Sequence, residues 1–295
     1  MTTSELVRLG RPVAREYDTG LAGCRATAVL PDEPVAVLGD RGTLAVVDLE
    51  SGDVRRHAFV DEWGPKSIAG LTGRRVLVAG VKAVYLYAIR EDRLDPLATW
   101  SIGSVGSIVD VAATASGSVF AVAAGDRVYR GQVDRPHLDV RSSADCLAVA
   151  VSADGTRVGS GRGGRVDLDP AARAEVTVND KDIPILSAGL SPDGRLLVAC
   201  DDITQTVLAD LDAGTTAQVR GAGKAVAARW SPDGSACALI ALTRTVQLLD
   251  RSGEPAGMLE PAGSGTYYLL GGGWTADGRS LVAGTEHGRI LSWTW

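Results

Sequence analysis

The chain has 295 residues, of which 45% are hydrophobic and 22% are charged, and it carries a formal net charge of −6. This composition is typical of a globular protein with enough apolar material for a core, which argues against a disordered chain. The acidic balance argues against a nucleic-acid partner, because proteins that bind phosphate backbones usually carry a basic excess.

The N-terminal residues show no targeting or membrane signal. Residues 1–9 lack the apolar core of a signal peptide, and no run approaches the ~20 apolar residues of a spanning helix. We therefore expect a cytoplasmic protein that does not bind a membrane. The cysteines are predicted to be buried fillers, because no paired spacing indicates a disulfide or a zinc site; they are Cys24, Cys146, Cys200 and Cys237.

A short turn that joins two apolar runs recurs along the chain. Asp-Gly favours such a β-hairpin turn because glycine readily adopts positive φ. The seven predicted turns lie at residues 31–34, Thr72-Gly73, Ser116-Gly117, Asp154-Gly155, Asp193-Gly194, Asp233-Gly234 and Asp277-Gly278. From Gly73 onward the turn glycines are 44, 38, 39, 40 and 44 residues apart, a period typical of propellers and solenoid arrays.

Each repeat contains four predicted strands. They cover 26–30, 35–38, 43–49 and 54–58 in the first repeat, 185–190, 196–199, 206–211 and 216–219 in the fifth, and 226–230, 236–241, 245–250 and 256–259 in the sixth. Seven units of about 42 residues fit the chain, and stacked four-stranded units bury such runs. We predict an all-β, seven-bladed β-propeller of four-stranded antiparallel blades that forms a single domain over residues 1–295.

The seventh repeat is one strand short. Its predicted strands cover 268–274, 280–283 and 289–293, while residues 12–17 form a segment that lies before the first repeat and belongs to none of the repeats. We predict that residues 12–17 pair with the strand that ends at Trp293, so that blade 7 comprises about 267–295 plus 12–17. This pairing would close the ring and leave no open edge on the first and last blades.

The repeats resemble those of WD-repeat (WD40) β-propellers over essentially the whole chain. The best matches are residues 230–234 with 245–250, and residues 46–52; Asp48 and Asp250 keep the Asp place of the Trp-Asp signature, and Trp293 keeps the Trp place. No Gly-His pair precedes any repeat, so the family's polar tetrad is mostly absent. Lactonase-like and other bacterial propellers share the Ser-Pro-Asp-Gly hairpin, which leaves the subfamily open.

The resemblance implies a non-catalytic interaction or scaffold module that holds a protein or peptide partner. In a propeller of this strand order, the loops between blades and the loops between second and third strands share one face, here called the top face. The residues predicted to bind a partner there are Asp61, Glu62, Trp63, Lys66, Lys82, Trp100, Arg162 and Arg165.

Trp63 and Trp100 lie on neighbouring predicted loops, and exposed aromatics are typical of binding hot spots. The alternative is that Trp63 folds back over its own blade. Residues 160–165 form a Gly-rich basic loop whose two guanidinium groups could hold a phosphate or a carboxylate, or they form a plain turn.

The alternative function is a small-molecule binder or a metal-dependent hydrolase with its site at the central channel. Four acids in two top-face loops of one blade could converge on Ca²⁺, which takes six to eight oxygens, or be solvated loop acids; they are Asp180, Asp182, Asp201 and Asp202. Glu286 and His287 are the other candidates for such an enzyme. No nucleophile elbow or dinucleotide fingerprint is present, and no cofactor other than Ca²⁺ is considered.

Overall fold

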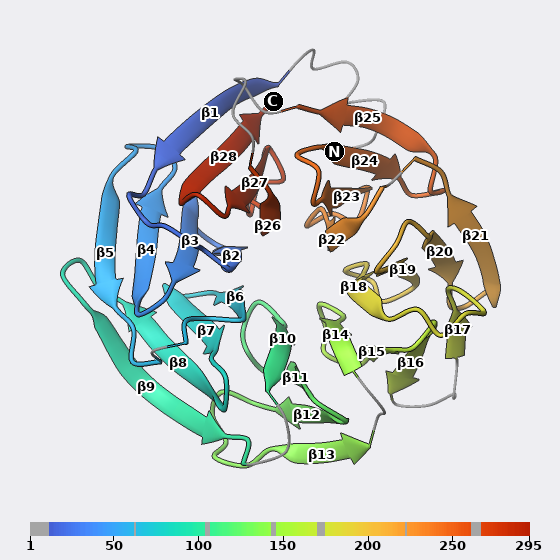
Figure 1. Ribbon diagram of the computed structural model, residues 1–295, viewed down its shortest axis with the longest axis horizontal. Helices are drawn as coiled ribbons and strands as arrows, with labels where there is room; N and C mark the ends of the chain where they lie inside the picture. The colour runs from blue at the N-terminus through green and yellow to red at the C-terminus, as the bar shows by residue number, and fades with distance from the viewer. Residues whose placement is uncertain are drawn as a thin grey trace.

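The computed structural model is a ring of seven four-stranded antiparallel sheets (Figure 1). It describes residues 12–61, 63–103, 107–142, 146–169, 175–221, 223–260 and 267–295. All regular secondary structure in these ranges is β-strand, and they contain no helix that could cross a bilayer. The predicted seven-bladed all-β propeller is confirmed.

In blades 1 to 6 the four strands follow one another in chain order, from the centre of the ring to its rim (Figure 1). The strands of blades 1 to 3 are β2 (Ala26–Val29), β3 (Val35–Asp40), β4 (Thr43–Asp48) and β5 (Val54–Ala58); β6 (Ser67–Leu71), β7 (Arg75–Ala79), β8 (Ala83–Ile89) and β9 (Leu94–Ser101); and β10 (Ile108–Ala113), β11 (Phe120–Ala124), β12 (Arg127–Gly131) and β13 (Asp139–Ser142).

The strands of blades 4 to 6 are β14 (Cys146–Val151), β15 (Val158–Arg162), β16 (Arg165–Asp169) and β17 (Glu175–Thr177); β18 (Ile185–Leu190), β19 (Leu196–Asp201), β20 (Thr206–Asp210) and β21 (Thr215–Val219); and β22 (Ala225–Trp230), β23 (Ala236–Ala241), β24 (Val246–Asp250) and β25 (Pro255–Leu259). Blade 7 contains β26 (Leu269–Trp274), β27 (Ser280–Thr285) and β28 (Arg289–Thr294), with β1 (Val13–Asp18) as its fourth strand.

Strand β1 closes the ring, as the sequence predicted. It pairs antiparallel with β28 in an unbroken register from Val13 opposite Thr294 to Asp18 opposite Arg289. In Figure 1, β1 lies on the rim beside β28, although the two are at opposite ends of the chain. Blade 7 therefore depends on residues from both ends of the sequence.

The apolar core lies between blades rather than within them. The described residues form seven buried clusters, and each cluster joins two neighbouring blades, including one in which Val282 and Ile290 of blade 7 pack with Ala36 and Leu38 of blade 1. The second strand of a blade is covered on both faces, so β19 and β23 are buried at every position. This double cover explains why the sequence shows continuous apolar runs instead of alternation.

The four Ser/Thr–x–Asp–Gly hairpin turns are closed by their own side chains. In the blade 5 turn, Ser191 Oγ donates to Asp193 Oδ1 at 2.5 Å and accepts from Leu196 N at 2.8 Å, while Gly194 takes a φ of +69°. Burial alone would raise the pKa of Asp193, but hydrogen bonds from Ser191 and Arg251 lower it to about 2. The Ser/Thr–x–Asp–Gly sequence is thus a turn that satisfies its own polar groups.

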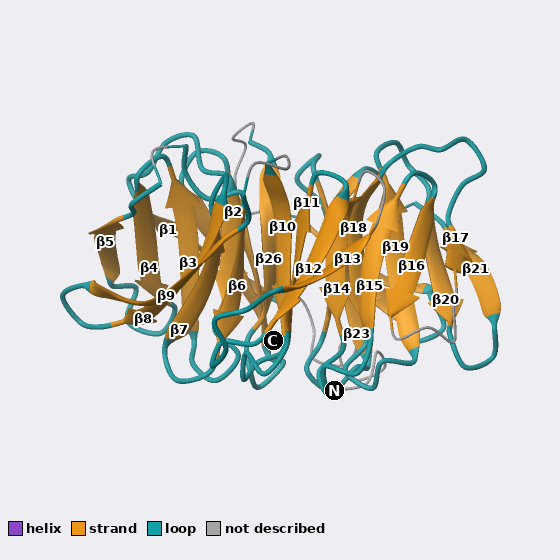
Figure 2. Cartoon of the chain, turned by 90° about the horizontal axis from the view of Figure 1, so that it is seen from below, coloured by secondary structure: helices purple, strands orange, loops and turns teal. Residues whose placement is uncertain are grey.

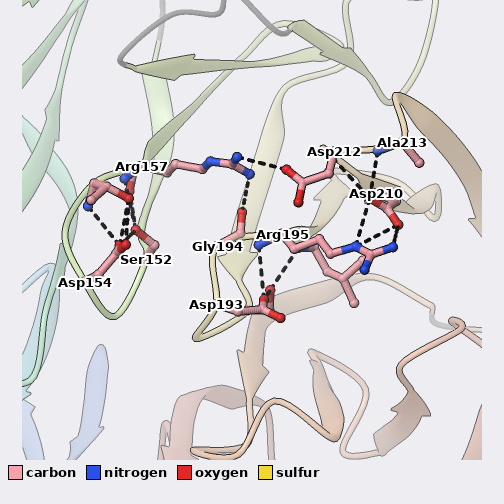
Figure 3. Close-up of polar contacts among 12 residues, drawn as sticks. Ser152, Asp154, Arg157, Asp193, Gly194, Arg195, Asp210, Asp212 and Ala213 are labelled. Atoms are coloured by element: carbon pink, nitrogen blue, oxygen red, sulfur yellow. Dashed lines mark hydrogen bonds and ion pairs between the residues drawn. The ribbon is translucent and has the colours of Figure 1, made fainter.

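Arginines connect these turns around the ring, which the sequence did not predict. An arginine donates to a turn carbonyl of the next blade three times in succession: Arg75 to Ser116 O at 3.1 Å, Arg130 to Gly155 O at 2.9 Å and Arg157 to Gly194 O at 2.8 Å. Figure 3 shows that Arg157 also reaches Asp212, at 2.9 Å, so a single side chain of blade 4 holds two turns of blade 5. These contacts link blades on the face opposite the top face, here called the bottom face.

Removal of β1 should strongly destabilise the protein. A chain that starts at residue 19 loses a ladder of several backbone hydrogen bonds at about 1 kcal/mol each, and its melting temperature should fall by roughly 10 °C or more. A chain that starts at Pro12 is the matched control, because it keeps every residue of β1. Equal melting temperatures for the two truncations, measured by circular dichroism, would contradict closure by this strand.

Arg157→Ala should lower the free energy of unfolding by about 1–2 kcal/mol, because it removes the charged donor shared by two turns of the next blade. Arg165→Ala is the control in the same blade. Within the described residues, Arg165 pairs with Glu175 of its own sheet alone, at 2.8 Å on the surface, and its loss should cost within about 0.5 kcal/mol. Urea unfolding measures both values, and equal losses would show that the contact between blades has no special role.

Candidate functional site

The top face carries the loop that the sequence singled out as a partner-binding segment. Figure 2 shows the disk edge-on, with the C-terminus at its lower edge, where the hairpin turns lie. The loop from Phe59 to Lys66 connects β5 to β6 on the opposite edge, next to the loop between β7 and β8.

Trp63 is exposed on this loop, with 64% of its surface accessible. Asp61 fixes the loop beneath it: one carboxylate oxygen accepts from Trp63 N at 2.9 Å, and the other accepts from Val81 N at 2.9 Å. Gly80 lies directly against this carboxylate, and a side chain at that position would collide with it. Trp63 therefore projects from a loop that is anchored to the neighbouring blade, and it does not fold back over its own blade.

The surroundings of Trp63 combine apolar surface with positive charge. Val60 is 70% exposed on the same loop. Lys82 is exposed in the loop that Asp61 contacts, and Arg41 is exposed in the equivalent loop of blade 1, whose backbone lies against Gly64. Both carboxylate oxygens of Asp61 accept backbone hydrogen bonds. Glu62 lies outside the described residues.

Trp100 does not lie on a top-face loop, and this part of the prediction is corrected. It belongs to β9, which extends for eight residues, and only 3% of its surface is exposed. Its indole packs edge-on against Phe120 and donates to Arg135 O at 2.9 Å. Trp100 is a core residue between blades 2 and 3, so its side chain is not available to a partner.

Arg162 and Arg165 do not form a free basic loop. Both lie in strands, on either side of the two-residue turn Gly163-Gly164. Arg162 pairs with Asp167 at 2.8 Å and with Glu175 at 3.3 Å, and Arg165 pairs with Glu175 at 2.8 Å. Their charges are therefore largely neutralised within their own sheet, which removes the basis for a phosphate site at this turn.

The four acids proposed for Ca²⁺ do not converge on one point. Asp201 is 1% exposed and uses its oxygens within its own blade, accepting from Ile203 N and Gln205 N at 2.9 Å and from Asn179 Nδ2 at 3.2 Å. Asp202 pairs with Lys224 at 2.5 Å.

Asp180 and Asp182 are exposed on the loop that precedes β18. Within the described ranges no three acidic, histidine or cysteine side chains form a metal-binding group. Buried Asp201 therefore orders its loop instead of presenting ligands.

The candidates for an enzyme are also dispersed. His287 lies 3.6 Å from Glu286 on a surface loop, and Glu286 in turn accepts from Tyr268 N at 3.2 Å. His57 is buried in β5, where burial lowers its pKa. All four cysteines are buried and free, and burial raises the pKa of Cys24, Cys146 and Cys200 to about 12, so they are fillers as predicted.

The first strands of the seven blades surround a central channel (Figure 1). The cavities at its two ends differ in the residues that line them. At the bottom face a cavity of about 310 Å³ is lined mostly by small residues such as Ala28, Gly70 and Ala188. At the top face a second cavity of about 120 Å³ is lined by six polar or charged residues, of which the sequence analysis identified only Lys66, as a partner-binding residue. They are Arg25, Lys66, Ser67, Asp110, Ser187 and Arg229.

Asp110 is the acid of this top cavity, and it is fully hydrogen-bonded. Its Oδ1 accepts from Ser67 Oγ at 2.8 Å and Val111 N at 2.9 Å, and its Oδ2 accepts from Val149 N at 3.0 Å. Burial raises its pKa, against the effect of these hydrogen bonds. Asp110 thus connects the inner strands of blades 2, 3 and 4. The one feature of the sequence that could have indicated this site is an acid among the apolar residues of β10.

Comparison of the chain with protein-family models and with curated proteins finds no match. The propeller fold is therefore established by the arrangement of the blades, and the function has to be argued from the surfaces described above.

Calcium should not stabilise the protein. Because Asp201 and Asp202 are already bound to protein groups, addition of millimolar CaCl₂ should leave the melting temperature equal to that in matched MgCl₂. A saturable rise specific to Ca²⁺, abolished by Asp180→Asn, would show that these loops rearrange into a calcium site.

Proposed function

We propose that this protein is a non-catalytic interaction module of WD-repeat type that holds a protein or peptide partner on its top face, centred on Trp63. The observation that supports this most is the exposed indole on a loop that Asp61 fixes to the next blade. A large aromatic side chain on a rigid support binds at low entropic cost, because the loop is already ordered before association.

The partner that fits this surface combines an apolar side chain with acidic groups. Val60 and Trp63 supply apolar contact area, while Lys82 and Arg41 lie on the two neighbouring loops. Opposite charge at the rim of an interface increases the association rate and fixes orientation. A cytoplasmic location remains part of this proposal.

The WD-repeat assignment is supported by the acid that ends the third strand of several blades. Asp48, Asp210 and Asp250 each accept two backbone amides of the turn that follows. This capping role explains why the Asp of the Trp-Asp pair persists where Val47 or Leu249 replaces the Trp. The acid closes a turn, whereas the preceding position only has to be apolar and buried.

Trp63→Ala should strongly weaken partner binding without unfolding the ring. The test is affinity capture from the native host with the wild type, Trp63→Ala and Met258→Ala, followed by a binding measurement with the purified partner. Met258 is the matched control, because its side chain is 56% exposed on the outer strand β25. Loss of a hot-spot aromatic should raise the Kd for the partner at least about tenfold, which corresponds to about 1.4 kcal/mol of binding free energy.

A protein retained by the wild type and Met258→Ala but lost by Trp63→Ala would support the proposal, provided that the melting temperatures agree. Capture of the same proteins with equal affinity by all three chains would contradict it.

A further inference from the structure

The top mouth of the channel gathers positive charge from three blades. Arg25 precedes β2, Lys66 precedes β6 and Arg229 lies in β22, and all three line the same cavity of about 120 Å³. Among the described residues, Asp110 is the only acid that lines it with them. The cavity therefore has an excess of two positive charges even when Asp110 is ionised.

Asp110 compensates part of this charge, because Arg229 lies close enough to interact with it electrostatically. The carboxylate oxygens of Asp110 are occupied by Ser67 Oγ and two backbone amides. Arg229 donates to Gly272 O at 3.2 Å and to Ala228 O at 3.0 Å, which uses two of its five N–H groups. Arg25 and Lys66 form no salt bridge within the described part of the chain.

A hydroxyl donor lies in the same wall. Ser187 is buried, and its Oγ accepts from Ala228 N at 2.8 Å, which leaves its own hydrogen free to donate. Apolar residues such as Ile68 and Leu186 also line the cavity, but the surface that faces it is mainly polar, in contrast to the cavity at the bottom face. Converging guanidinium, ammonium and hydroxyl donors are the groups that bind oxyanions in proteins.

We propose that the top mouth of the channel is a binding site for a phosphate-sized oxyanion, held by Arg25, Lys66 and Arg229 with Ser187 as a further donor. A cavity of about 120 Å³ has room for one tetrahedral anion together with bound water. Three cations from blades 1, 2 and 6 surround the ligand, so the bound anion links opposite sides of the ring.

Isothermal titration calorimetry of the full chain with inorganic phosphate, in buffer matched for ionic strength with chloride, tests this site. Melting temperature is a poor readout, because phosphate and sulfate stabilise most proteins through exclusion from the surface. The wild type should show saturable binding of one anion, which Arg25→Gln and Lys66→Gln each weaken at least tenfold.

Lys82→Gln is the matched control. It removes one top-face lysine that does not line the cavity, and it should bind phosphate as the wild type does. A parallel titration with O-phosphoserine distinguishes the source of the anion: tighter binding than inorganic phosphate indicates a phosphate carried on a side chain, and equal or weaker binding indicates a free anion.

Absence of saturable binding of both ligands would overturn the proposal. Equal weakening by Lys82→Gln and Lys66→Gln would also overturn it, because general surface charge would then explain the binding. If Arg25→Gln unfolds, Arg25→Lys replaces it; this variant keeps the charge but loses the guanidinium, and it should bind phosphate more weakly than the wild type. Since no partner protein is present, failure here leaves the role of Trp63 untouched.

Discussion

The whole ring depends on the pairing of β1 with β28. Every other blade is a continuous stretch of chain, but blade 7 obtains its outer strand from residues that precede blade 1. This ladder fixes the two ends of the sequence in one sheet and holds blades 7 and 1 against each other, where their shared cluster of Val282, Ile290, Ala36 and Leu38 packs. Without it, the outer edge of β28 would be left unpaired.

The two faces of the disk differ in how their polar groups are used. On the bottom face the hairpin acids are bonded to their own serines and to arginines, so the turns are rigid and chemically satisfied. The top face keeps an exposed Trp63 and, at the channel mouth, the cations Arg25 and Lys66. We therefore propose recognition at the top face, where the apolar surface of Trp63 and the charges of Arg25 and Lys66 are exposed to a ligand.

The fold could be predicted from the sequence because its signals are local and repeated. Asp193-Gly194 and its copies mark one turn per blade, and the missing strand of blade 7 identified β1. Side-chain partners were not predictable in the same way. The sequence places Trp100 in a loop, because no residue near it indicates that β9 continues to Ser101. Contacts with Phe120 of blade 3 bury its side chain instead. No sequence pattern indicates the hydrogen bond from Arg157 to a carbonyl oxygen of the next blade. The cations of the channel come from three different repeats and are far apart in the chain.

The most direct test of the closed ring is hydrogen–deuterium exchange of the peptide that covers Val13–Asp18. The amides of β1 that face β28 should exchange as slowly as those of β21, an outer strand of a blade formed by continuous chain. Full exchange of β1 within seconds, while β21 stays protected, would contradict the account, because it would mean that the end strand is not part of the sheet.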